Sequence, residues 1–419
     1  MTDARAPERA DDYDPFAAFD ESTGADIRDP YPGFEELRQR CPVQEGDLYD
    51  LLGYDAPYDV PDRGDTPPRY VVFGHEEVAA VLRDGETFSS AGYQETIGLV
   101  MGHSILGMDE PEHHQYRGLI QQAFTRKAME RWEADTVYPV VHDLVGQLAD
   151  RGQADLVRDL TFPFPIKVIS LMLGLPESEL PRFHRLAVEL ITIITDIERG
   201  LNASIELAEL FGAVIEQRRA EPRDDLISVL AGAELDGHRL SDEEIIAFLR
   251  LLLPAGAETT YRSSSNLLFG LLTNPDQLDA LRGDRSLMPR AIEEGLRWEA
   301  PLTGIARTTT RDVDLGGVSI PAGSLIQVGL GGANHDGGRY EHAERFDLFR
   351  EPQQHMAFAF GPHMCLGMHL ARMETTVALN AVLDRLPNVR LAPDAGDVYV
   401  SGVGFRAPRA LPVVFDIRG

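Results

Sequence analysis

Apolar residues recur at helical spacing through most of the chain and alternate only in short segments. Residues 112–272 follow the helical spacing almost throughout. Alternation predicts strands at 70–73, at 313–330 around the turn Pro321-Ala322-Gly323, and at 398–417. The pattern therefore indicates a mainly α protein with small β-sheets.

A long helix is predicted in the middle of the chain. Ser241 followed by Glu244 forms a capping box, in which each side chain accepts a hydrogen bond from the other residue's backbone N–H. The helix runs from there toward Leu272 and spans roughly 45 Å at 1.5 Å per residue. Shorter helices are predicted at residues 34–40, 76–82 and 288–298, and from Cys365 to about Leu386.

The composition indicates one large folded unit. The chain has 419 residues, of which 43% are hydrophobic, and no long Gly/Ser-rich or Pro-rich linker divides it. We expect a single domain over residues 15–419. Residues 1–14 are polar and acidic, which predicts a flexible tail.

The charge disfavours several classes of partner. The net charge of −29 repels nucleic acids and anionic lipids. No export signal is visible at the N-terminus, and the most apolar stretches, such as 186–194 and 248–254, fall well short of the roughly 20 residues that cross a bilayer. We therefore expect a cytoplasmic protein that binds neither nucleic acid nor membrane.

The chain contains only two cysteines, Cys41 and Cys365. Two cysteines cannot form a disulfide-stapled scaffold or a four-cysteine zinc or iron–sulfur site. Cys41 lies at the predicted end of a short helix and is interpreted as an inert free thiol. Any metal chemistry through sulfur must then use a single thiolate.

Cys365 stands just before a predicted helix and behind a turn that contains Gly361 and Pro362. A helix N-terminus carries about +0.5 elementary charge, which lowers the pKa of a thiol and favours the thiolate that a ferric ion needs. Gly361 and Gly367 leave the backbone clear for a flat macrocycle. For an isolated cysteine, a buried structural thiol is the more common alternative.

The residues around this cysteine match a known signature. Their order resembles the heme-binding signature of the cytochrome P-450 superfamily, F-x-x-G-x-H-x-C-x-G followed by L-A-R, and the chain departs from it only at Ala359, where many members have a second glycine. The resemblance implies that Cys365 is the proximal iron ligand. A thiolate ligand favours O–O cleavage, so this ligand argues for oxygen activation. It also implies that Phe358 packs beside the cysteine and that His363 contacts a heme propionate. The matching residues are Phe358, Gly361, His363, Cys365 and Gly367.

A second motif interrupts the long helix. Pro254 lacks a backbone N–H and is followed by the small pair Ala255-Gly256, so a local opening of the helix is expected. Alone, this pattern would indicate a kink with a solvated acid and alcohol. Its similarity to the family element A/G-G-x-D/E-T-T/S implies that Ala255 and Gly256 form a groove for dioxygen, and that Glu258 and Thr259 deliver protons.

Two further groups of residues fit the same family. Glu294 and Arg297 match its E-x-x-R pair, and the segment Glu344-Arg345-Phe346 resembles the part of the chain that supplies Arg345 as the third member of a structural triad. His113 and Arg117 share one helix face and fit its H-x-x-x-R contact to a heme propionate.

Arg307 also fits a propionate-binding position of the family. The segment Asn334-His335-Asp336 stands where many relatives have Asn-Arg-Asp. Histidine therefore replaces that arginine, and the arginine's local contact is not expected.

The resemblance extends from about residue 30 to the C-terminus and implies a fold and an activity. The fold would be a triangular prism with a long central helix over the heme. The activity would be that of a monomeric monooxygenase with non-covalent heme b, which uses O₂ and two electrons to hydroxylate, epoxidise or dealkylate a small organic molecule. No redox domain is fused, so a ferredoxin and an NAD(P)H-dependent ferredoxin reductase would supply the electrons, with Arg372 as a docking residue.

Three alternatives remain open at this point. One is a peroxide-driven peroxygenase of the same fold, although such enzymes tend to lack the acid-alcohol pair that Glu258 and Thr259 retain. A non-catalytic heme-binding or gas-sensing protein would form no product coupled to NADPH. A helical scaffold without heme would stay colourless when reconstituted with heme.

The substrate is the least determined part of the prediction. The distal pocket is expected between residues 93–106, the helix at about 186–197, the residues beside Gly256, the stretch 302–305 and the turn near Val403. The side chains there suggest an apolar ligand, which leaves terpenoids, steroids, fatty acids, aromatics and macrolides open, although a buried core explains them equally well. The candidate residues are Ile97, Leu99, Val100, Leu302, Ile305 and Val403.

Overall fold

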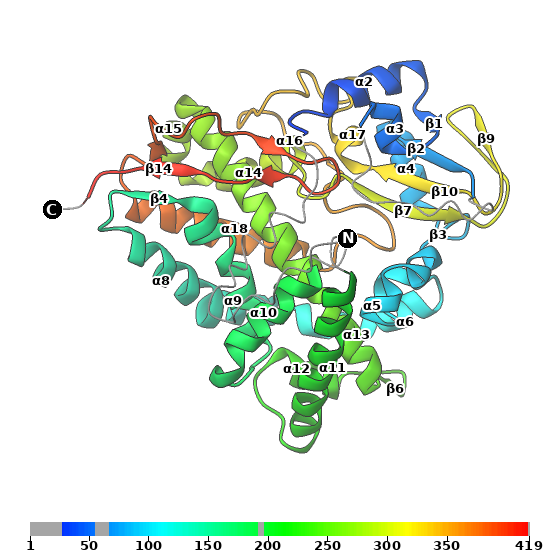
Figure 1. The fold of residues 1–419 in the computed structure, drawn as a ribbon, viewed down its shortest axis with the longest axis horizontal. Coiled ribbons are helices and arrows are strands. Elements are labelled where there is room, and N and C mark those ends of the chain that lie inside the picture. Colours follow the sequence, from blue (N-terminus) through cyan, green and yellow to red (C-terminus); the bar gives the residue numbers. More distant parts are fainter. Residues whose placement is uncertain (1–26, 55–66, 192–196, 418–419) are drawn as a thin grey trace, which may run out of the picture.

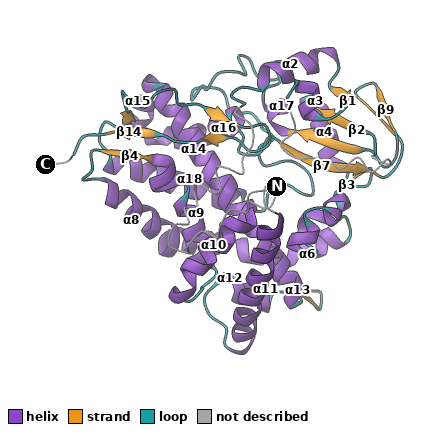
Figure 2. Ribbon diagram, in the orientation of Figure 1, coloured by secondary structure: helices purple, strands orange, loops and turns teal. Residues whose placement is uncertain are grey.

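The computed structural model describes residues 27–54, 67–191 and 197–417, so the predicted tail over residues 1–14 lies outside the described residues. Helices make up most of the described chain, and the strands gather mainly at one side (Figures 1 and 2). The predicted mainly α fold with small sheets is confirmed. No helix in these ranges is both long and apolar enough to cross a membrane.

The helices follow the predicted order and close to the predicted bounds. A helix over residues 288–298 was expected, and the observed helix has the same two ends. Before the long central helix lie α2 (Tyr31–Arg40), α3 (Leu48–Leu52), α4 (His75–Arg83), α5 (Gly98–Met101), α6 (Glu112–Ile120), α7 (Arg126–Trp132), α8 (Tyr138–Leu148), α9 (Pro163–Met172), α10 (Leu180–Ile191), α11 (Ile197–Ala220) and α12 (Leu226–Gly232). After it lie α15 (Pro275–Gly283), α16 (Met288–Trp298), α17 (Leu330–Asn334) and α18 (Met368–Arg385).

The largest sheet joins the first and last thirds of the chain. Its strand order is β1-β2-β10-β7-β3, and β10 pairs in parallel with β2 and antiparallel with β7. This pairing brings residues 88–89 beside residues 308–309, which are far apart in sequence. The strands are β1 (Val43–Glu45), β2 (Arg69–Val72), β3 (Phe88–Ser89), β7 (Gly304–Thr309) and β10 (Leu325–Gly329).

The remaining strands form smaller sheets. One has three strands in the order β11 (Arg390–Leu391), β14 (Pro412–Val414) and β4 (Gln153–Asp155), so the end of the chain pairs with its middle. The others are pairs: β5 (Glu234–Leu235) with β6 (His238–Arg239), β8 (Val313–Leu315) with β9 (Val318–Ile320), and β12 (Val400–Ser401) with β13 (Ala407–Pro408).

The predicted central helix is present and is interrupted where the sequence predicted. Ser241 Oγ accepts a hydrogen bond from the Glu244 N–H at 3.2 Å, and Glu244 Oε2 accepts one from the Ser241 N–H at 2.7 Å, which confirms the capping box. The rod consists of α13 (Asp242–Leu252), a π-helical turn η8 (Leu253–Glu258) and α14 (Thr259–Thr273). Pro254 cannot donate to the helix ladder, and the wider turn accommodates this loss.

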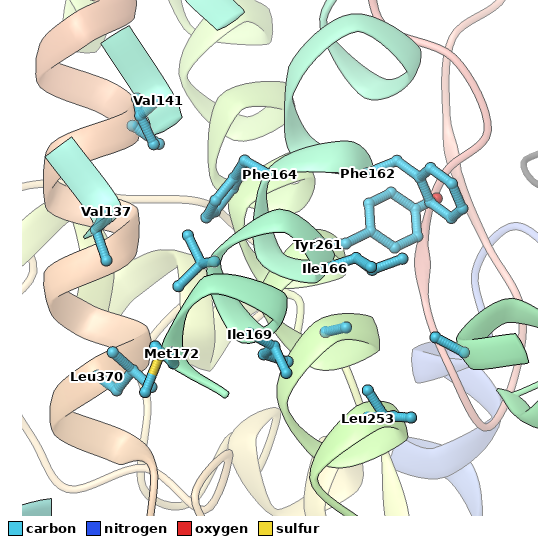
Figure 3. Packing of buried hydrophobic residues seen from close by; sticks show 14 of the residues in the cluster. Val137, Val141, Phe162, Phe164, Ile166, Ile169, Met172, Leu253, Tyr261 and Leu370 are labelled. Carbon is cyan, nitrogen blue, oxygen red and sulfur yellow. The ribbon is translucent and has the colours of Figure 1, made fainter. Parts of the chain in front are cut away.

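The main hydrophobic core forms where the surrounding helices pack against this rod. Figure 3 shows Ile169 of α9 beside the turn that carries Leu253, and the ring of Phe162 against that of Tyr261 in α14. The two rings meet edge to face, with centroids 5.5 Å apart. Contacts of this kind hold the rod in a fixed position and so fix the side chains of η8.

A buried ion pair joins the two ends of the described chain. Arg406 donates two hydrogen bonds to Glu299, at 2.8 and 3.1 Å, and a third to the backbone oxygen of Arg28. The Tyr31 hydroxyl donates to the same carboxylate at 2.9 Å. The start of α2 is therefore attached to the strands near the C-terminus, which closes the fold around the rod.

Candidate functional site

The loop before α18 presents the sulfur of Cys365. The Cys365 N–H donates to the Phe358 carbonyl at 2.9 Å, and the Gly367 N–H donates to the sulfur. The loop reverses direction with Ala359 and Gly361 in the left-handed region, at φ +56° and +74°. Ala359 therefore adopts a conformation that favours glycine, the residue that many members of the similar family have there.

The charge state of Cys365 differs from the sequence-based expectation. Burial raises the pKa of the Cys365 thiol, although the Gly367 amide and the charges of Arg117 and Arg372 act in the opposite direction. The expectation of a lowered pKa is wrong for the chain alone, because desolvation of the sulfur outweighs the backbone donor. A cation bound to the sulfur would favour the thiolate.

Gly361 has a different structural role from the one expected. A side chain at Gly361 would collide with the carbonyl oxygen of Leu82 at the end of α4, and its positive φ excludes most residues. This glycine lets the loop pack on α4, which is a stronger reason than clearance for a macrocycle. At Gly367 an added Cβ meets nothing within 4 Å, so that position borders open space.

The predicted cations gather beside this loop. The His113 and His363 rings lie 4.0 Å apart, and Arg117 donates to the Met364 carbonyl at 2.7 Å. His363 Nε2 lies 3.2 Å from Ser90 Oγ. Arg307, on the neighbouring strand β7, is buried and contributes to the potential at His363. Helix α6, strand β7 and the cysteine loop therefore meet at one site.

This cluster has a strong positive potential. Burial and the charges of His113, Arg307 and Arg117 lower the pKa of His363 to about 3. His113 Nδ1 lies 3.0 Å from Glu110, but its Nε2 is buried without a hydrogen-bond partner. A buried donor without a partner is costly, so the cluster is suited to an anion that would accept from it.

The turn η8 of the rod carries the second predicted group of site residues. Ala255 is exposed although it lies in the middle of the chain's longest helical element, and the Thr259 hydroxyl donates to its carbonyl at 2.7 Å. Gly256 was expected to lie in this groove. A Cβ there would come within 3.2 Å of Ile169, so Gly256 also permits the close approach of α9.

Glu258 is buried and paired with a residue that sequence reasoning missed. Its Oε1 accepts from Arg262 Nε at 3.2 Å and from Nη2 at 3.0 Å. Burial raises the pKa of Glu258, while Arg262 lowers it. The i, i+4 spacing of the two residues was the available signal. Within the described contacts, the carboxylate is held by Arg262 and makes no bond to Thr259.

The structural triad contains a different third residue. Arg297 donates two hydrogen bonds of 2.8 Å to Glu294, as predicted. The assignment of Arg345 is wrong: its side chain is 69% exposed and lies 3.3 Å from Glu344. Arg350 takes its place, with Nε 3.2 Å from Glu294 Oε1. The chain turns between the two arginines, so Arg345 contributes only its backbone carbonyl, which accepts from Arg297.

The triad also supports the cysteine loop. Arg297 donates to the carbonyl of Asn334, and the Asn334 side chain accepts from the Met356 N–H at 2.6 Å. At the position where many relatives have arginine, His335 stacks on Tyr31 with centroids 3.5 Å apart. Asn334 therefore connects α16 to the loop through its backbone carbonyl and its side-chain oxygen.

The predicted pocket residues occupy several elements. Leu99 is 75% exposed, and Val403 is buried, with its carbonyl accepting from the Thr303 hydroxyl. The predicted helix 186–197 is α10 and the start of α11, and residues 192–196 lie outside the described residues. The other candidates lie as follows: Ile97 just before α5, Val100 in α5, Leu302 in a bridge to Phe405, and Ile305 in β7.

The predicted docking residue Arg372 is already paired. Its guanidinium donates two hydrogen bonds to Glu293, at 2.6 and 2.8 Å, and stacks over the Phe358 ring. The neighbouring cation Arg83 is exposed, and its guanidinium lies 4.7 Å from the centre of the Phe360 ring in the cysteine loop. Arg83 is therefore the freer cation on this face.

Comparisons with known proteins agree on one family. The profile described as Cytochrome P450 matches residues 166–391. The chain is 41% identical to cytochrome P450 107B1 of Saccharopolyspora erythraea, covering 75% of this chain and 77% of that protein. It is 37% identical to the steroid C26-monooxygenase of Mycobacterium tuberculosis, covering 81% and 93%. The solved structure of CYP109E1 from Bacillus megaterium in complex with testosterone matches with a TM-score of 0.81 at 30% identity, covering 93% and 100%.

Proposed function

The chain belongs to the cytochrome P450 family and is a heme-thiolate monooxygenase, and from this premise we propose that Cys365 is the ligand of its heme iron. The observation that supports this role most strongly is the convergence of the Cys365 loop with the buried cations of α6 and β7. The cysteine alone would fit a structural thiol. A sulfur beside a site for anions fits a metal cofactor that carries carboxylates.

The residues present fit heme b, the cofactor of this family. The unpartnered Nε2 of His113 and the guanidinium groups of Arg117 and Arg307 can donate to the two propionates, with His363 beside them. Cys365 supplies the thiolate, and the open space at Gly367 leaves room for the ring. When bound, the heme activates O₂ with two electrons and inserts one oxygen atom into the substrate.

Glu258 and Thr259 are proposed to supply protons to the distal groove. Thr259 borders the exposed Ala255, so its hydroxyl could turn from the Ala255 carbonyl toward the groove and donate a proton there. Glu258 is buried on Arg262 and must leave that partner to pass a proton on. Arg262 then acts as a positioning residue that holds the carboxylate between transfers.

Replacement of Thr259 by alanine should uncouple the enzyme. The hydroxyl that controls proton transfer is lost, so NADPH oxidation should continue while product per NADPH falls by about tenfold and peroxide accumulates. The Thr259→Ser variant, which keeps a hydroxyl, should retain most of the coupling. Thr260→Ala is the matched control: it removes a neighbouring hydroxyl that donates to Glu374 and not to the Ala255 carbonyl. It should leave the coupling unchanged. Normal coupling in Thr259→Ala would contradict the assignment.

We further propose that the electrons come from a ferredoxin and its NAD(P)H-dependent reductase, and that the enzyme acts as a cytoplasmic monomer. P450 monooxygenases use redox partners and apolar substrates. An exposed cation next to the cysteine loop can attract an acidic ferredoxin even though the net charge is −29. Arg83 meets this condition better than the paired Arg372.

The substitution Arg83→Glu should raise the KM for ferredoxin by about tenfold at low salt. Peroxide-supported turnover should not change, because it does not require docking. Arg239→Glu is the control: Arg239 is an exposed arginine paired with Glu234 in the β5–β6 hairpin. An unchanged KM, or a turnover rate that does not respond to ionic strength, would exclude electrostatic docking at Arg83.

The proposed substrate is an apolar molecule that enters beside α5 and β7, near Ile97, Val100, Leu302, Ile305 and Val403. One solved neighbour holds testosterone and one relative is a steroid monooxygenase, so steroids are the first compounds to screen. The reaction is tested with isotope-labelled O₂, NADPH, ferredoxin and reductase. Label in the product supports the monooxygenase. Product formed only with peroxide would favour a peroxygenase.

A further inference from the structure

Arg250, in α13, is a partly buried arginine that pairs with no residue of the described ranges. Its side chain is partly enclosed, and its Nε is buried without a hydrogen-bond partner. No carboxylate in the described ranges lies within ion-pair distance of it. Three fully buried arginines are paired with carboxylates: Arg218 with Asp225, Arg297 with Glu294 and Arg406 with Glu299.

The guanidinium lies where three helices meet. One of its terminal nitrogens is 3.9 Å from the position of a Cβ added to Gly102, which directly follows α5. Ser204 of α11 donates to the Val100 carbonyl of α5, so α11 closes the same region. Arg250 therefore lies at the junction of α5, α11 and α13, beside the segment predicted to line the distal pocket.

An arginine in this position is costly for the free protein. Burial alone lowers the pKa of Arg250, and no neighbouring charge compensates for the lost water. The chain has 68 acidic residues, yet none of those described pairs with this cation. An apolar residue would fill the same position without the desolvation cost, and an anion bound to the guanidinium would offset that cost.

We propose that Arg250 binds the carboxylate of the substrate, so that the substrate is an apolar molecule with one anionic end. The inference rests on the proposed function, because it assigns a ligand group to the pocket of that enzyme. The planar guanidinium can donate two parallel hydrogen bonds to a carboxylate. No second cation of the described residues acts on Arg250, so the position matches a monoanion better than a phosphate dianion.

This anchor also predicts where the substrate is oxidised. Arg250 and Thr259 are nine residues apart on the rod, which corresponds to about 14 Å. With the carboxylate on Arg250, the part of the molecule that reaches the groove at Ala255 and Thr259 is remote from the acid. Oxidation is therefore directed to carbons far from the carboxylate.

The test compares acids with their neutral esters by isothermal titration calorimetry on the holoenzyme. The probes are dodecanoic acid and cholanic acid, each beside its methyl ester. In the unmodified protein at least one acid should bind more tightly than its ester. In Arg250→Gln the affinity for that acid should fall by about 10- to 100-fold, while ester binding changes less than about threefold. Arg250→Lys should lose less, because the charge remains.

The control is Arg239→Gln, at an exposed arginine of the β5–β6 hairpin. It should change the affinity for neither the acid nor the ester. Equal loss of acid and ester in Arg250→Gln, or no preference for either acid in the unmodified protein, would overturn the inference. The proposed function is checked separately on the same samples by the spectrum with carbon monoxide. A normal spectrum without acid selectivity would contradict only the binding of a carboxylate by Arg250. Acid selectivity without that spectrum would support carboxylate binding and contradict the Cys365 assignment.

Discussion

Replacing Cys365 by serine is expected to abolish the strongly red-shifted carbon monoxide absorption of the reduced protein and to lower turnover to the background of the assay. A serine hydroxyl stays protonated and cannot donate electron density to iron as a thiolate does. The fold should persist, because the Cys365 N–H that bonds to the Phe358 carbonyl is retained. Heme should still bind, since the cations His113, Arg117 and Arg307 are unchanged.

The second cysteine provides a matched control for this experiment. Cys41 caps α2, and its sulfur lies 3.7 Å from the Gly316 carbonyl, on a different part of the chain. Cys41→Ser should keep both the spectrum and the activity. A Cys365→Ser protein that retains the red-shifted band, or a Cys41→Ser protein that loses it, would refute the assignment of the iron ligand.

Disruption of the buried ion pair of α16 should have the largest effect on stability. Arg297 donates to Glu294 and to the carbonyls of Asn334, Ala343 and Arg345. In Glu294→Gln the arginine loses its counter-charge inside the protein, and the cost of breaking such a pair is about 3–5 kcal/mol. The free energy of unfolding, measured by urea denaturation of the holoprotein, should fall by this amount.

The two arginines of the neighbouring loop distinguish the observed triad from the predicted one. Arg345→Ala should change the free energy of unfolding by less than about 0.5 kcal/mol, because its side chain is exposed. Arg350→Ala should cost more, since its guanidinium contacts Glu294 and the backbone oxygens of Glu341 and His342. The opposite order would restore Arg345 to the triad.

The local features of the fold could be read from the sequence with good accuracy. The capping box at Ser241, the bounds of the helix over 288–298 and the opening at Pro254 all depend on residues within a few positions of one another. The signature around Cys365 is also local, and it identified the family without any knowledge of the fold. Periodicity, capping and missing donors act over one or two helical turns, so they are visible in a short window.

The structural roles of several individual residues could not be read from the sequence. Gly361 is required because α4 approaches it, and Gly256 allows the approach of α9. The Cys365 thiol is less acidic than its place near a helix start suggests, because the surrounding protein removes water from the sulfur. Each of these effects comes from an element that is distant in sequence.

The sequence by itself determined the family and the order of the elements, because these are encoded by residue types at short, fixed spacings. The tertiary structure decided which charges are paired: Arg350 in place of Arg345 on Glu294, Arg262 on Glu258, Arg372 on Glu293, and no described residue on Arg250. Pairing depends on which side chains packing brings within about 3 Å and shields from water. That proximity is set by the whole fold and cannot be read from local spacing.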